Sequence, residues 1–78
     1  MTKKEKMLII DIHSAILRRI CCHINRGEKE LAIEAYICGS RFPYNLVMSD
    51  EEMAANTSRI MKDYNVSREE WNEILRSI

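Results

Sequence analysis

Residues 2–27, TKKEKMLIIDIHSAILRRICCHINRG, have the pattern of one long amphipathic helix, and this stretch decides the fold class. Thr2 followed by Glu5 has the spacing of a capping box, which is typical of a helix start. Gly27 directly follows the periodic run and suits the left-handed conformation that is common just past a helix end. The pattern predicts a helix over about 3–25.

A second helical segment, EKELAIEAYIC, follows over about 28–38 and stops before Gly39, another candidate for a C-terminal cap. Because the joint between the two segments is short, they should fold back on each other as an antiparallel hairpin. Most of the circumference of this second segment is apolar, because its side chains are mainly leucine, isoleucine, alanine, tyrosine and cysteine. A helix that is apolar on nearly all sides is buried on nearly all sides, so it is either the central element or partly faces another chain.

The capping-box spacing occurs twice more, in Ser49 with Glu52 and in Ser67 with Glu70. These starts predict two further helices, over about 50–64 and 68–78. The first has an apolar stripe at Met53, Thr57, Ile60, Met61 and Tyr64. The second has Trp71, Ile74, Leu75 and Ile78 at the spacing of an amphipathic helix, with Trp71 as a core anchor.

Composition agrees with this helical pattern. The 78 residues include only two glycines and one proline, which is little turn chemistry for a many-stranded sheet. The hydrophobic fraction of 46% is normal for a globular protein. We therefore predict an all-α fold, a single helical domain over 1–78 with four helices, of which the first two form an antiparallel hairpin.

The first helix also holds two adjacent cysteines beside a histidine. Projection at about 100° per residue places Cys21 at the edge of the apolar arc and Cys22 on the polar side, together with Ser14. His13 and His23 lie near the apolar arc but about 15 Å apart along the axis, so they cannot share a metal ion. Core packing is favoured, and we predict no metal or cofactor.

The alternative to core packing is a metal site across the hairpin, built from Cys21, His23 and Cys38. His13, in an apolar arc, is predicted to be a hydrogen-bonded core histidine.

Residues 26–43, RGEKELAIEAYICGSRFP, resemble the second half of a tetratricopeptide repeat, with Gly27, Ala32 and Tyr36 at matching offsets and Pro43 one place early. The preceding helix departs from that family at Arg19, Ile20 and His23, and the sequence contains no second copy of the motif. Such repeats bury their faces only against stacked neighbours. The resemblance therefore indicates a generic helical hairpin and no family.

Charge is balanced overall but divided along the chain. Residues 1–26 carry six basic and two acidic side chains, a net charge of +4, and the remaining six basic and ten acidic side chains give −4. This asymmetry is typical either of contact with a partner or of attraction between two parts of one protein. The sequence has no apolar stretch of membrane-spanning length and no signal-peptide pattern, so we expect a cytoplasmic protein without a membrane partner.

For function, the sequence has no glycine-rich phosphate loop, no G-x-S-x-G and no H-E-x-x-H, so we expect no enzymatic activity. The prediction is a small protein–protein interaction module, a regulator, adaptor or inhibitor that forms a homodimer. The connection SRFPYNLVM is rich in aromatic and aliphatic residues, which dominate interfaces. These side chains either bind the partner or plug the open end of the domain. The predicted partner-binding residues are Tyr36, Phe42, Tyr44, Leu46 and Val47.

The alternative function is that of a small regulator that binds nucleic acid. The C-terminal pair of predicted helices has the order of a helix-turn-helix, but Glu69, Glu70 and Glu73 would repel phosphates. The better surface is the basic face of the first helix. Its candidate residues are Lys3, Lys4, Lys6, Arg18, Arg19 and Arg26.

Overall fold

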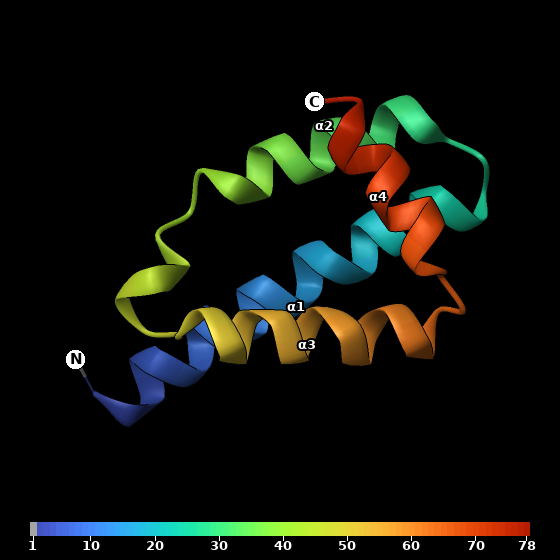
Figure 1. Ribbon diagram of the computed structural model, residues 1–78. Coiled ribbons are helices and arrows are strands. Elements are labelled where there is room, and N and C mark those ends of the chain that lie inside the picture. The colour runs from blue at the N-terminus through green and yellow to red at the C-terminus, as the bar shows by residue number, and fades with distance from the viewer. Residues whose placement is uncertain (1) are drawn as a thin grey trace.

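The computed structural model describes residues 2–78 and shows an all-α fold, without strands in that range (Figure 1). The elements are α1 (Lys3–Asn25), α2 (Lys29–Ser40), the short 3-10 turn η1 (Tyr44–Leu46), α3 (Asp50–Asp63) and α4 (Arg68–Arg76). The predicted fold class is confirmed, including the N-terminal helical hairpin and the two capped helices after it.

The three predicted N-terminal caps are present. Ser49 accepts a hydrogen bond from the Glu52 backbone N–H at 3.1 Å, and the Glu52 carboxylate accepts one from the Ser49 backbone N–H at 3.1 Å. Ser67 forms the same reciprocal pair. The start of α1 differs, because the Thr2 hydroxyl accepts from the Glu5 backbone N–H and also donates to the Glu5 carboxylate. Each cap satisfies backbone donors that a helix start leaves free.

The end of α1 has the left-handed cap that its sequence predicts. Gly27 has a φ of +72°, its N–H donates to the Ile24 carbonyl at 3.0 Å, and the Glu28 N–H donates to the His23 carbonyl at 2.9 Å. These two bonds form a Schellman motif, which turns the chain at once into α2. Asn65, with a φ of +56°, occupies the equivalent position after α3.

The predicted end of α2 at Cys38 is wrong, because the helix continues through Gly39 to Ser40. Gly39 is buried, and a Cβ atom there would lie 2.5 Å from Cγ2 of Ile16. The glycine therefore permits α1 and α2 to approach closely and does not cap the helix. A sequence pattern cannot distinguish these two uses of glycine.

The central element is α1 and not α2. The first helix packs against α2, α3 and η1, whereas α2 contacts α1 and α4. Only Ala32, Ala35 and Gly39 of α2 are buried, and Leu31 and Cys38 are exposed. The expectation that α2 would be covered on nearly all sides within one chain is thus wrong. The small residues of α2 face α1, and part of its larger apolar residues face outward.

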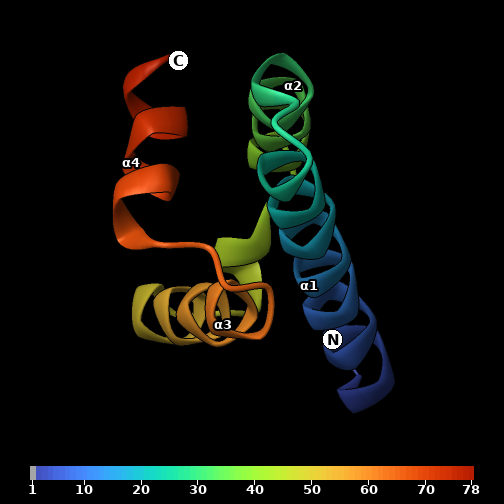
Figure 2. The same ribbon diagram turned by 90° about the vertical axis from the view of Figure 1, so that its right-hand side faces the viewer.

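The core lies where the C-terminal half of α1 meets the other three helices. Trp71 is buried in it, as predicted. In Figure 2, α4 stands across the molecule from the α1–α2 hairpin, with α3 below. Leu75 and Ile78, predicted on the buried stripe, are exposed instead. Ile78 lies beyond the end of α4 at Arg76, and on the helix itself Trp71 and Ile74 are the buried residues. The buried apolar cluster comprises Leu17, Ile20, Cys21, Ala32, Ala35, Ile60, Met61, Val66, Trp71 and Ile74.

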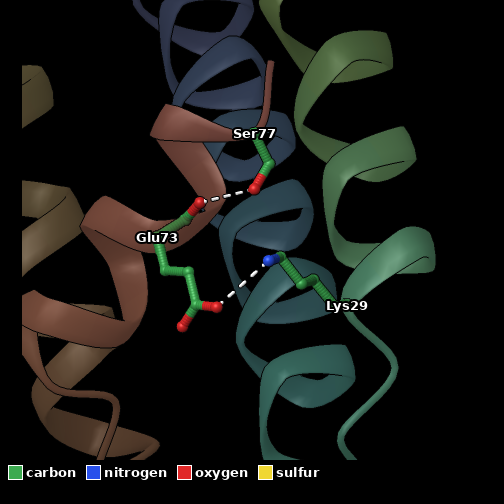
Figure 3. Close-up of polar contacts among 3 residues, drawn as sticks. All are labelled: Lys29, Glu73 and Ser77. Carbon is green, nitrogen blue, oxygen red and sulfur yellow. Dashed lines mark hydrogen bonds and ion pairs between the residues drawn. The ribbon is translucent and has the colours of Figure 1, made fainter.

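One ion pair connects the start of α2 with α4. The Lys29 ammonium lies 3.0 Å from the Glu73 carboxylate, and the Ser77 hydroxyl donates to the Glu73 backbone carbonyl at 2.8 Å (Figure 3). Both charged side chains are exposed, so the pair contributes little to stability. Its effect is that Lys29 and Glu73 are already paired with each other and are not unpaired charges on this side of the molecule.

Candidate functional site

A groove of about 250 Å³ lies at the centre of the fold, with walls from all four helices. Its floor is α1, which lies between α2 and α3 (Figure 1). Most of the side chains that line it are apolar, which is typical of binding pockets. The lining includes His13, Ile20, Tyr36, Tyr44, Thr57 and Trp71.

A polar cluster joins α1 to α3 at one end of this groove. The Asn56 side-chain amide donates to the Ser14 hydroxyl at 2.9 Å and lies 2.9 Å from Nδ1 of His13. Arg59 donates to the Asn56 amide oxygen. His13 and Ser14 are both buried, so the cluster satisfies polar groups that would otherwise be costly.

The cluster fixes the tautomer of His13. A guanidinium can only donate, so the Arg59 contact orients the Asn56 oxygen outward and the Asn56 NH₂ group toward His13 and Ser14. Nδ1 of His13 must then accept, which leaves the proton on Nε2. Burial also lowers the pKa of His13 from its ordinary value of 6.5. The prediction of a hydrogen-bonded core histidine is confirmed.

We expect the stability of the protein to decrease as pH falls from about 7.5 to about 5.5. The unfolded chain protonates His13 near pH 6.5, whereas the folded chain keeps it neutral to lower pH. The stabilisation is therefore complete above pH 6.5 and is lost as pH falls through the lowered pKa. Urea unfolding at the two pH values measures it, and His13→Asn, which retains an acceptor near Nδ1 but does not titrate, should reduce the difference.

The carboxylates of the two capping boxes do not interfere with this measurement. Hydrogen bonds from the backbone N–H and side chain of Ser49 lower the pKa of Glu52 from 4.5, and Ser67 does the same for Glu70. Both groups therefore titrate below the pH range used. An equal pH dependence in His13→Asn and the wild type would contradict the role of His13.

Tyr44 is nine-tenths buried. Its ring packs edge-on against His13 at a centroid distance of 4.7 Å and lies tilted against Phe42 at 5.1 Å. Its hydroxyl is buried and has no hydrogen-bond partner among the described residues. Burial raises the pKa of Tyr44. The ring of Tyr44 is therefore packed into the fold against α1.

The other predicted partner-binding residues are less covered. Leu46 is 71% exposed, Phe42 is exposed, and Val47 is half-buried. Tyr36 is half-buried, lines the groove and packs edge-on against Trp71 at 6.1 Å. The connection thus divides into the buried ring of Tyr44 and the exposed apolar side chains of Phe42 and Leu46.

The six basic residues of the alternative function are all exposed. They are spread from Lys3 to Arg26, over about 34 Å at 1.5 Å per residue. In the C-terminal pair of helices, α4 contacts α2 and α3 packs against α1. Glu69, Glu70 and Glu73 on α4 are exposed, so that helix presents carboxylates to any ligand.

The three cysteines are free, and their environments differ. Cys21 is fully buried, and burial raises its pKa to about 11. Cys22 is half-buried and Cys38 is exposed. Among residues 2–78, no group of three or more histidine, cysteine or acidic side chains is arranged to hold a metal ion. The alternative metal site across the hairpin is thus not assembled, and His23 instead contacts Glu28 at 3.1 Å.

Two residues of the polar cluster were missed in the sequence. Ser14 was assigned to the polar side of α1, but it is buried against Asn56. Asn56 has the signal that would have found it, since it lies three residues after Met53 and four before Ile60, on the apolar stripe of α3. A polar residue on such a stripe needs a buried partner.

No helix within residues 2–78 is both long and apolar enough to cross a membrane.

Comparison with protein families, curated proteins and solved structures finds no match to this chain.

Proposed function

We propose that this protein is a small non-enzymatic interaction module that binds another protein through the central groove and the exposed apolar side chains of the connection after α2. The observation that carries the proposal is the groove itself, an apolar depression lined from all four helices, with the exposed Phe42 packed on Tyr44 of its lining. Large exposed apolar side chains beside a concave apolar surface are typical of protein interfaces.

The chemistry of the groove favours an apolar side chain as its occupant. Nδ1 of His13 is engaged by Asn56, and the hydroxyl of Tyr44 is buried, so aliphatic and aromatic groups make up most of the accessible wall. A volume of about 250 Å³ accommodates one or two large side chains of a partner. An anchor residue that enters a pocket is the usual centre of binding energy in such interfaces.

Filling the groove tests the proposal. Ala54 is exposed and lines the groove, so Ala54→Phe should occupy the space without removing a core contact. We expect this variant to lose its protein partner while its thermal stability stays near that of the wild type. The measurement is affinity purification of tagged protein from its native host, with quantitative mass spectrometry of the proteins that copurify.

The matched control is Ala55→Phe, which adds the same ring at the next exposed position of α3, outside the groove lining. This variant should retain the partner. Equal capture by the two variants and the wild type would remove the groove from the binding surface.

Nucleic acid remains the second candidate, because none of the six basic residues is engaged in an ion pair among the described residues. Free cations on one helix attract phosphates, and such binding weakens steeply with salt. If Lys4→Glu combined with Arg18→Glu removes the biological activity of the protein while Ala54→Phe does not, this candidate replaces the first.

A further inference from the structure

We infer that the outer face of the α1–α2 hairpin binds a second copy of this chain, with α2 of one protomer antiparallel to α2 of its partner. The face is a groove of about 360 Å³ on the side of the hairpin, next to the central groove, with which it shares only Ile16 and Gly39. The inference does not depend on the proposed function. The residues that line the groove are Ile16, Arg19, Leu31, Glu34, Ala35, Cys38 and Gly39.

The apolar part of this face follows the helix repeat. Leu31, Ala35 and Cys38 have the i, i+4, i+7 spacing that places side chains on one stripe of a helix. Leu31 is 42% exposed and Cys38 is exposed. Gly39, where the two helices approach closely, also lines this groove, on which another helix can lie.

The charges on the same face are self-complementary. Arg19 on α1 and Glu34 on α2 both border the groove. The ion pairs of the described chain are His23 with Glu28 and Lys29 with Glu73, so Arg19 and Glu34 are each unpaired within the protomer. A twofold axis places Arg19 of each protomer opposite Glu34 of the other protomer. An antiparallel dimer therefore forms two Arg19–Glu34 pairs at once.

This arrangement favours a second copy over an unrelated partner. A face whose charges all had one sign would repel a second copy of itself. This face has one cation and one anion on opposite sides of an apolar stripe, so a twofold rotation places opposite charges next to each other. The pairing also covers the part of α2 that the monomer leaves exposed. Sedimentation equilibrium should give a mass of twice 9.2 kDa, about 18.4 kDa.

A charge exchange tests the contact in the full-length chain. Glu34→Arg alone or Arg19→Glu alone places like charges opposite each other across the axis, and each should raise the dimer dissociation constant at least about tenfold. The double variant with both changes restores opposite charges, and its dissociation constant should return toward that of the wild type. Circular dichroism verifies that each variant is folded. If a charge variant is not folded, Leu31→Gln tests the same face in its place.

Asp63→Arg is the matched control, since it makes the same change of charge on α3 and should leave the dimer intact. Alkylation of Cys38 gives an independent readout, because the thiol should react more slowly in the wild-type dimer than in Glu34→Arg. All measurements contain a reductant, so that a disulfide cannot produce the dimer.

The inference is overturned by a wild-type protein that sediments as a monomer of 9.2 kDa at all concentrations. It is also overturned by a double variant that dissociates like the single ones, by an Asp63→Arg protein that dissociates equally, or by a series of ever larger species, which a closed twofold contact does not form. These outcomes leave the Ala54→Phe test of the central groove unaffected.

Discussion

Replacing Trp71 with alanine is expected to lower the free energy of unfolding by about 3 to 5 kcal/mol, the range for a buried tryptophan. Trp71 is only 5% exposed and belongs to the cluster in which α4 meets α1, α2 and α3. Its ring also packs edge-on against Tyr36. Since no other residue of α4 except Ile74 is buried, the loss should detach α4 from the hairpin. Urea denaturation followed by circular dichroism measures the change.

Leu75→Ala is the control for this variant, because Leu75 belongs to the same helix but is exposed. Its loss should be small. If Trp71→Ala does not fold in water, Trp71→Phe provides a smaller truncation at the same site. A loss for Trp71→Ala no larger than that for Leu75→Ala would mean that the ring is not in the core.

Ile20→Ala is expected to cost about 2 to 5 kcal/mol, as for other fully buried isoleucines. Ile20 is 1% exposed and lies on the central helix, where the walls of the fold converge. The cavity left by the missing atoms cannot collapse easily, because α1 is held by both α2 and α3. For a domain of this size such a loss is a large part of the total stability.

Leu8→Ala tests whether the effect depends on burial. Leu8 lies on the same helix and is 60% exposed, so its truncation should change the unfolding free energy by less than about 0.5 kcal/mol. Urea denaturation of the two variants under one condition gives the comparison. Similar losses at Ile20 and Leu8 would show that the free energy follows helix propensity and not core packing.

The sequence predicted the local structure well because helix starts and ends are determined by neighbouring residues. Ser49 and Ser67 bind the backbone three residues ahead, and Gly27 needs only its own left-handed conformation. These contacts span a few positions, so their spacing is visible in a single chain. The same holds for Trp71, whose apolar neighbours on α4 marked it as a core residue.

The candidate site was less accessible to sequence analysis. Tyr36 and Tyr44 were named as binding residues, and both line the groove, but nothing local indicated that Tyr44 is buried while Leu46 is exposed. The link from Asn56 to His13 joins positions 43 residues apart. Such a contact depends on how α3 crosses α1, which no short stretch of sequence encodes.

The sequence by itself thus determined the number of the helices, the starts of α1, α3 and α4 and the cap at Gly27, since hydrogen bonds and periodicity within each segment fix them. Only the tertiary structure decided which helix is central, since that depends on how closely two surfaces can approach. Gly39 shows the difference. Its sequence position suggested a helix end. In the structure, a Cβ atom at this position would lie only 2.5 Å from Cγ2 of Ile16, so a glycine is needed for the contact of α1 with α2. With the small residues of α2 turned toward α1, part of its larger apolar side chains face outward, and this packing produces the exposed face.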